Sequence, residues 1–170
     1  MQIYIMRHGE AQDFVGENSV DDSQRVLSAR GEVEAKIMID WFEKMPISPK
    51  HVFVSPYVRA RQTCDIVTSL MDTIITPLDF ITPLDDAKPV HDFIDGWLTE
   101  QIFYKNKGSD ESTNQQQESL LIISHMPLVS FLVAELTQSN NTPIFATAGV
   151  AHIEYDIDKM QGTLQGMICP

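Results

Sequence analysis

The sequence predicts a three-layer α/β/α sandwich whose sheet is mostly parallel with an antiparallel edge. Short apolar segments of strand length alternate along the chain with segments of helical apolar period, as in proteins whose parallel strands are joined by helices. The most apolar segment, 120–123, is typical of a central strand covered by helices on both faces. The tail, 144–167, alternates polar and apolar residues, which indicates one or two strands at the edge of the sheet.

Length and composition place the chain among folded globular proteins. Its 170 residues predict one domain, spanning residues 1–170, with a single sizeable core. The apolar fraction of 43% and the charged fraction of 21% are typical of a packed domain rather than a disordered chain.

The first elements follow from apolar spacing. Residues 3–6 form a short buried strand, and the polar stretch 13–24 is expected to be a loop. A helix is predicted over about 28–44. Apolar residues at a spacing of four are expected to form its inner face: Val33, Ile37, Trp41 and Met45.

A strand at 52–54 precedes the next helix, which is expected to open at Ser55-Pro56. This helix carries the apolar residues Val58, Ile66, Val67 and Leu70. The turn-rich segment 79–89 leads to a further helix with Pro89 in its first turn. Its apolar face consists of Val90, Phe93, Ile94, Trp97 and Leu98.

The segment Lys105–Ser119 is of low complexity and is expected to be a mobile surface loop. The central strand 120–123 follows it. A last helix begins at Met126-Pro127. Its inward residues are predicted to be Leu128, Phe131, Leu132 and Leu136.

Charge and cysteine content exclude several kinds of partner and location. With 24 acidic and 12 basic residues, the net charge is −12, which argues against binding to nucleic acid or to acidic membrane surfaces. No apolar run approaches the ~20 residues of a membrane span, and the N-terminus does not match a signal peptide. Cys64 and Cys169 form neither a disulfide framework nor a metal-ligand pattern, so we expect a cytoplasmic protein.

Several enzyme classes lack their motifs in this chain. It contains no phosphate-binding P-loop, no dinucleotide-binding glycine turn, no zinc-protease helix and no serine nucleophile elbow. No arginine follows Cys64 at the distance that a thiol phosphatase needs.

Cationic and imidazole side chains follow three of the predicted strands. Arg7-His8-Gly9 follows the first strand, Arg59 lies one turn into the helix after the second, and Ser124-His125 follows the central strand. Because such strand ends meet at one edge of a parallel sheet, we expect these side chains to surround one anion. Two guanidinium groups and two imidazoles suit the oxygens of a phosphoryl group.

A neutral imidazole nitrogen is a nucleophile toward phosphorus when its other ring nitrogen is protonated and held. We therefore expect His8 to attack and water to release the phosphoryl group afterwards. His125 and the two arginines would neutralise the growing charge, so neither a metal nor a cofactor is expected. Gly9 is expected to allow close approach of backbone to the ring or the phosphate.

These motifs resemble those of the histidine phosphatase (phosphoglycerate-mutase-like) superfamily. They are Arg-His-Gly at 7–9, Ser-Pro-x-x-Arg-Ala-x-Gln-Thr at 55–63 and Ser-His at 124–125, and Leu27-Ser28 also matches. The short chain and the run 123–129 most resemble the bacterial SixA-type phosphohistidine phosphatases. The resemblance implies that His8 is the phosphorylated nucleophile. It also implies that Arg7, Arg59 and His125 are catalytic residues that bind the phosphate.

One departure from the superfamily concerns the leaving group. Relatives that cleave phosphate esters use a carboxylate just after the third strand as general acid, whereas the best alignment here places Phe80 at that position. Asp79, Asp85 and Asp86 remain candidate acids. A phosphorylated histidine needs less help, because imidazole has a pKa of about 6.5 and leaves readily.

The resemblance and this departure together predict a monomeric phosphohistidine phosphatase. Its expected partner is the phosphorylated histidine phosphotransfer domain of a sensor kinase in a signalling relay. One alternative is a phosphatase of small phosphomonoesters, which would use one of the three aspartates as acid. A further alternative is a non-catalytic module that binds phosphoproteins.

Other charged and aromatic residues receive structural interpretations. Glu10 is expected either to orient His8 or to cap a helix. Exposed surface charge is expected for Arg25, Arg30 and Arg61. Structural or solvent-facing positions are expected for His51, His91 and His152, and core positions for Trp41 and Trp97.

Overall fold

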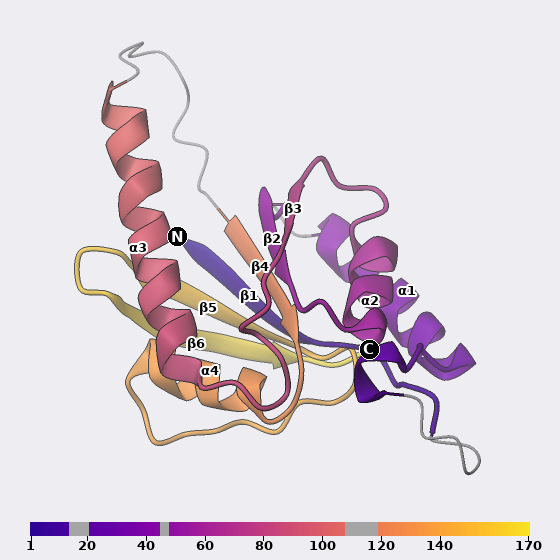
Figure 1. The fold of residues 1–170 in the computed structure, drawn as a ribbon. Helices are drawn as coiled ribbons and strands as arrows, with labels where there is room; N and C mark the ends of the chain where they lie inside the picture. The colour runs from indigo at the N-terminus through magenta and orange to yellow at the C-terminus, as the bar shows by residue number, and fades with distance from the viewer. Residues whose placement is uncertain (14–20, 45–47, 108–118) are drawn as a thin grey trace.

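The computed structural model describes residues 1–13, 21–44, 48–107 and 119–170 (Figure 1). The strands are β1 (Gln2–Arg7), β2 (His51–Val54), β3 (Ile74–Pro77), β4 (Ser119–Ser124), β5 (Val150–Asp156) and β6 (Gln161–Ile168). The helices are α1 (Ala29–Lys44), α2 (Val58–Val67), α3 (Ala87–Lys107) and α4 (Leu128–Thr137), with the 3-10 turn η1 (Asp22–Gln24).

The six strands form one mixed sheet in the order β3-β2-β4-β1-β5-β6. Neighbours from β3 to β1 are parallel, whereas β5 pairs antiparallel with both β1 and β6. Every residue of β4 is buried, which confirms the predicted central strand. The tail forms two strands, of which only β6 lies at the edge, because β5 is enclosed between β1 and β6.

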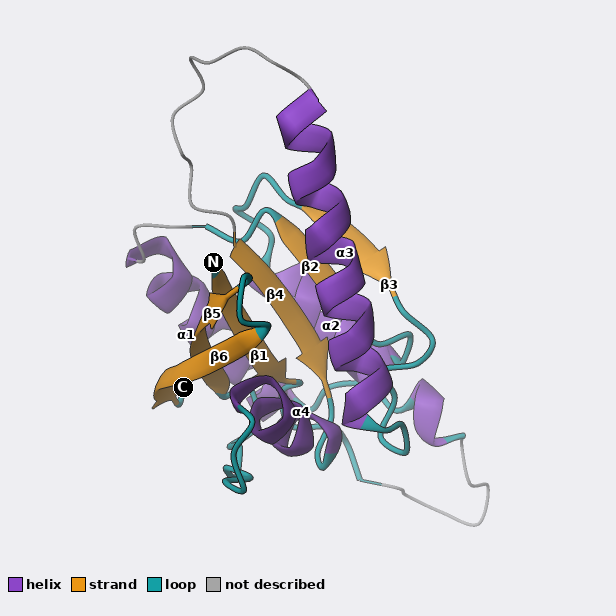
Figure 2. Cartoon of the chain, turned by 90° about the vertical axis from the view of Figure 1, so that its left-hand side faces the viewer, coloured by secondary structure: helices purple, strands orange, loops and turns teal. Residues whose placement is uncertain are grey.

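Helices cover both faces of the sheet, which confirms the predicted α/β fold with an antiparallel edge (Figure 2). Alternation along β1 supplies both cores: Ile3 and Ile5 pack on the side of α3 and α4, whereas Tyr4 and Met6 pack on the side of α1 and α2. Within the described residues, no helix combines the length and the apolar character needed to cross a membrane.

The predicted inner face of α1 is wrong at Val33 and Ile37, whereas Trp41 packs against the core as expected. Val33 and Ile37 are 55% and 46% exposed, and the buried face instead consists of Gly31, Glu34, Ala35, Met38 and Phe42. A Cβ on Gly31 would lie 2.1 Å from the Glu10 carbonyl oxygen. This close backbone contact fixes the rotation of the helix and turns the other apolar stripe outward. Met45 lies outside the described residues.

Phe131, which was predicted to face inward, and Leu70, which was placed in the second helix, are both exposed. Leu70 is 69% exposed because it follows the end of α2, and Phe131 of α4 is 51% exposed. Trp97 packs against the core as predicted.

Two predicted loops are shorter than expected. The helix α3 runs through Lys107 and β4 begins at Ser119, so both ends of the predicted loop 105–119 belong to regular structure. Residues 108–118 lie outside the described residues. The predicted loop 13–24 contains η1 at its end, and its residues 14–20 are likewise not described.

Candidate active site

Backbone hydrogen bonds connect the three strand ends that carry the motifs. The His8 amide donates to the Ser124 carbonyl, and the Ser55 amide donates to the Ile123 carbonyl, each at 3.0 Å. Arg7 and Ser124 are register partners in the parallel pair β1–β4. The first residues beyond β1, β2 and β4 therefore emerge side by side at the carboxyl edge of the sheet.

These strand ends enclose a pocket of about 380 Å³, a size common for small-ligand sites. All four residues singled out by the sequence motifs line it. Its lining consists of Arg7, His8, Glu10, Ala11, Asp22, Arg25, Arg59, Pro83, His125, Met126 and Thr147.

The His8 ring is held in one orientation by its neighbour. Its Nδ1 lies 2.6 Å from the Gly9 carbonyl oxygen, which only accepts hydrogen bonds, so Nδ1 carries the proton. The Arg59 Nε donates to His8 Nε2 at 3.2 Å, as an unprotonated ring nitrogen requires. Burial, together with the charges of Arg59, Arg7 and Arg25, lowers the pKa of His8 to about 4. The ring is thus neutral at pH 7, with its lone pair on Nε2.

The His125 ring lies beside His8, with ring centres 4.9 Å apart. Its Nε2 is 2.7 Å from the Ser55 hydroxyl oxygen. Burial, with the nearby His8 and Arg59, lowers the pKa of His125 to about 2.

Two buried nitrogens of the pocket have no hydrogen-bond partner among the described residues. They are Arg7 Nε and His125 Nδ1. The Arg7 Nη1, in contrast, donates to the Phe145 carbonyl at 2.8 Å. Because unpartnered buried polar groups are rare in folded proteins, two in one cationic pocket indicate a site for an anion.

Arg59 is fixed by contacts on several sides. Its guanidinium lies 4.9 Å from the Tyr57 ring centre, and its two Nη atoms donate to the Asp22 carbonyl at 2.5 Å and to Asp22 Oδ2 at 2.8 Å. Arg25 also contacts this carboxylate, with Nη1 3.1 Å from Asp22 Oδ1. The prediction of Arg25 as plain surface charge is therefore wrong, because its side chain lines the pocket.

Asp22 is a pocket residue that sequence reasoning missed, because it lies in a stretch without apolar period. The sequence signal for Asp22 was its negative charge, three residues before the positive charge of Arg25. Asp22 begins η1, and Arg25 directly follows it.

Gly9 makes two close backbone contacts, one of which was expected. The Gly9 backbone approaches the His8 ring, as expected, with its carbonyl oxygen 2.6 Å from Nδ1. In addition, a Cβ on Gly9 would lie 2.6 Å from the Gly31 carbonyl oxygen, so Gly9 also allows the segment after β1 to approach α1. The Glu10 carboxylate accepts from the Ser28 hydroxyl at 2.6 Å, and Ser28 Oγ accepts from the Gly31 amide. Glu10 therefore supports the helix start rather than the His8 ring.

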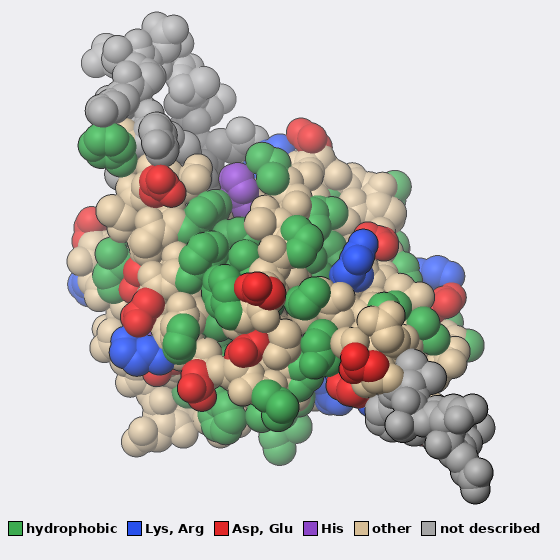
Figure 3. All heavy atoms as spheres, viewed as in Figure 1, with side chains coloured by type: hydrophobic (Ala, Val, Ile, Leu, Met, Phe, Trp, Pro, Cys, Tyr) green, Lys and Arg blue, Asp and Glu red, His purple; other side chains and the backbone are tan. Residues whose placement is uncertain are grey.

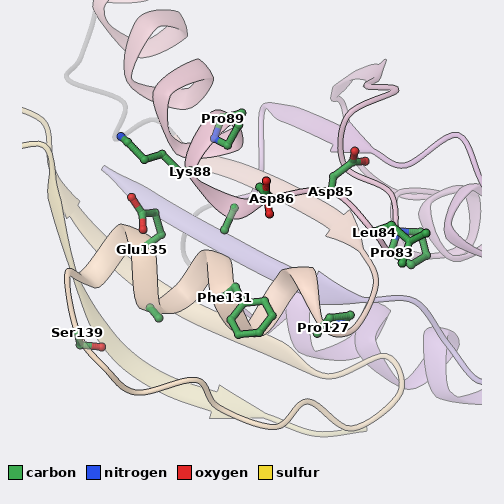
Figure 4. A pocket seen from close by; sticks show the side chains of 12 residues that line it. Pro83, Leu84, Asp85, Asp86, Lys88, Pro89, Pro127, Phe131, Glu135 and Ser139 are labelled. Carbon is green, nitrogen blue, oxygen red and sulfur yellow. The ribbon is translucent and has the colours of Figure 1, made fainter.

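The three candidate acids do not line this pocket. Asp85 and Asp86 line a neighbouring pocket of about 580 Å³, which shares only Pro83 with the first (Figure 4). Its other side consists of α4 residues, including Phe131 and Glu135. Asp79 is exposed and lines neither pocket.

The remaining histidines lie away from the pocket. His91 is buried and its Nε2 is 2.8 Å from the Tyr155 hydroxyl, while His152 stacks on Tyr4. His51 packs edge-on against Trp97. These positions fit the structural interpretation of all three. The described residues contain no group of three or more His, Cys, Asp or Glu that could hold a metal ion.

Similarity to known proteins extends over the whole chain. The sequence profile described as histidine phosphatase superfamily (branch 1) matches residues 3–81. The phosphohistidine phosphatase SixA of Escherichia coli (strain K12) is 31% identical over 172 aligned positions, covering 100% of this chain and 94% of that protein. A SixA homolog of Haemophilus influenzae is 32% identical over 95% of this chain and 92% of that protein. The solved structure of the protein histidine phosphatase SixA complexed with tungstate has a TM-score of 0.79 and 31% identity, covering 100% of this chain and 97% of that chain.

Proposed function

The chain belongs to the histidine phosphatase superfamily, and we propose that it hydrolyses phosphohistidine on a protein substrate. The observation that carries the proposal is the state of the His8 ring. Its Nδ1 is tied to the Gly9 carbonyl, and its unprotonated Nε2 lies in a pocket with Arg59 and His125.

In the first step, His8 Nε2 attacks phosphorus and displaces the substrate's imidazole, which leaves a phosphoryl group on His8. The low pKa of His8 keeps the nucleophile unprotonated at neutral pH. Arg7 Nε and His125 Nδ1 are donors without partners among the described residues, and they would bind the phosphoryl oxygens as charge grows on them.

In the second step, water attacks phosphorus and the bond to His8 Nε2 breaks. The hydrogen bond between His8 Nδ1 and the Gly9 carbonyl holds the ring in place, so Nε2 both accepts and releases the phosphoryl group. The pocket donors serve both steps, because the phosphorus stays between the same side chains.

The carboxylates of the pocket favour phosphohistidine over phosphomonoesters. The three candidate acids, Asp79, Asp85 and Asp86, are absent from its lining. Glu10 is engaged by Ser28, and the ion pairs with Arg25 and Arg59 keep Asp22 in its unprotonated form. An alkoxide leaving group needs a proton from a nearby acid. Imidazole leaves without one when its other ring nitrogen is already protonated. The two relatives named for SixA support the same substrate class.

The proposal extends to partner and location. The substrate would be the phosphorylated histidine phosphotransfer domain of a sensor kinase, approached by a monomer in the cytoplasm. Cys64 and Cys169 are both free thiols, as a reducing compartment requires. The face in Figure 3 carries more acidic than basic side chains, in keeping with the net charge of −12.

The test uses a histidine phosphotransfer domain that has been phosphorylated with phosphoramidate. The wild-type protein should release phosphate and His8→Ala should not, and brief reaction should leave an acid-labile phosphate on His8, detected by mass spectrometry at neutral pH. Equal release by both proteins would contradict the mechanism. Binding without turnover would favour the binding module, and faster hydrolysis of phosphoserine would favour the ester phosphatase while keeping the nucleophile.

A further inference from the structure

Two carboxylate side chains line the phosphate pocket together with its arginines. Of the described residues that line the pocket, Glu10 and Asp22 carry carboxylates. Glu10 is engaged with the start of α1 through Ser28 and lies 3.6 Å from Arg30. Asp22 instead contacts Arg59, the arginine whose Nε donates to the nucleophilic nitrogen of His8.

Asp22 is ionised and still has capacity to accept hydrogen bonds. Burial raises its pKa, but hydrogen bonds and charge from Arg59 and Arg25 outweigh this and hold the pKa below its ordinary value. One carboxylate oxygen accepts from Arg25 and the other from Arg59. Each oxygen has about two lone-pair positions, so each retains one. The side chain is 42% exposed and lines the pocket, so a substrate at the mouth of the pocket can contact the carboxylate.

A negative charge here disfavours a phosphate ester, because it repels the phosphate dianion and an ester has no positive charge to offer it. Phosphohistidine differs, because its imidazole ring carries a positive charge when the nitrogen opposite the phosphoryl group is protonated. We propose that Asp22 selects phosphohistidine substrates by accepting a hydrogen bond from this protonated ring nitrogen. The inference rests on the proposed function and assigns a specificity-determining residue to it.

The bonding changes agree with this assignment. His8 Nε2 forms a bond to phosphorus, the phosphorus–nitrogen bond of the substrate breaks, and its electron pair goes to the substrate ring. The ring keeps the proton on its other nitrogen and departs as neutral imidazole, so Asp22 neither gives nor takes a proton. Because the ring loses its positive charge as the bond breaks, Asp22 acts mainly on substrate binding, and its removal should raise KM more than it lowers kcat.

The experiment compares Asp22→Asn with Asp21→Asn in the full chain. Asp21 carries the same charge one residue away, but its Oδ1 accepts from the Ser23 amide and it does not line the pocket. The substrate is a histidine peptide phosphorylated with phosphoramidate, and the competitor is inorganic phosphate. Thermal unfolding of each variant checks that the fold is intact, and Asp22→Glu, which keeps the charge, should restore part of the binding.

We expect Asp22→Asn to raise KM for the phosphohistidine peptide about 10-fold or more, the usual effect of losing a hydrogen bond to a charged group, with kcat changed less than about threefold. The inhibition constant of inorganic phosphate should fall or stay constant, because the repelling charge is gone. Asp21→Asn should change neither value. If KM and the phosphate inhibition constant rise by the same factor, Asp22 only positions Arg59 and the inference is wrong.

Failure of the proposed function has a different signature. In that case the wild-type protein releases no phosphate from the peptide. An active wild type with an equally active Asp22→Asn variant contradicts only the role of Asp22.

Discussion

The imidazole rings of His8 and His125 lie 4.9 Å apart with their planes inclined by 59°, and neither carries a positive charge at neutral pH. Two protonated rings at this distance would repel each other and the surrounding arginines. Neutral rings can take two different roles. His8 offers the lone pair of Nε2 to phosphorus, and His125 offers a hydrogen-bond donor at Nδ1. Burial next to guanidinium groups therefore keeps both imidazole rings neutral, which both roles require.

Stability should fall as the pH drops from about 6.5 toward about 4. The folded-state pKa of His8 is lowered to about 4, so only the unfolded chain takes up a proton in this window, and acid favours unfolding. A His8→Gln variant removes this contribution. Between pH 7 and pH 5, the free energy of unfolding of the variant should drop by about 2 kcal/mol less than that of the wild type, from urea denaturation. Identical pH dependence in both proteins would show that the pKa of His8 is not lowered.

Arg59→Ala should lower kcat/KM for phosphohistidine about 100- to 1000-fold, the typical loss on removing one donor to a transition-state oxyanion. The side chain is 5% exposed and contacts His8 and Asp22. Arg61→Ala is the matched control, because Arg61 belongs to the same helix but is exposed and does not line the pocket. Steady-state kinetics should find Arg61→Ala within about twofold of wild type. A similar loss in both variants would point to a general effect of charge rather than to Arg59 itself.

Ser55→Ala should change the protonation pattern of the His125 ring. Ser55 Oγ accepts from the Tyr57 amide at 3.4 Å and lies 2.7 Å from His125 Nε2. We expect the Ser55 hydroxyl to donate its proton to Nε2, which leaves the ring proton on Nδ1. Without Ser55, nitrogen NMR should detect loss of this single tautomer, and kcat should fall about 10-fold. Ser124→Ala is the control, since its hydroxyl donates to the Ile81 carbonyl and not to the ring. An unchanged ring in Ser55→Ala would refute the role of the hydroxyl.

Gly9→Ala should destabilise the protein by about 1–3 kcal/mol, the usual cost of overpacking, because its Cβ would meet the Gly31 carbonyl oxygen. Gly96→Ala is the opposite case. A Cβ at Gly96 of α3 would have nothing within 4 Å, and this change should stabilise the protein by about 0.4–1 kcal/mol. Urea midpoints at pH 7 measure both. Equal effects at the two positions would mean that β1 can move away from α1.

The fold and the four motif residues were predictable because each signal is local. Parallel strands bring their carboxyl ends to one edge, so motifs that follow β1, β2 and β4 converge without further information. Their catalytic roles, and the assignment of residues 1–170 to one domain, stay predictions until measured.

Features that depend on contacts between distant segments were not predictable. The helix α1 has two apolar stripes, and the approach of Gly31 to Glu10, absent from any periodicity, decides which stripe is buried. Asp22 and Arg25 belong to the pocket only because η1 folds back beside Arg59.

The pairing of β1 has a consequence for biosynthesis. Its neighbours are residues 119–124 on one side and 150–156 on the other, so β1 can pair only after more than 100 further residues have been synthesised. A nascent chain that stops short of Ser119 already contains His8 but has neither of the strands that flank β1. Such a chain should not turn over substrate, because it lacks His125 and both strands that hold β1 in the sheet.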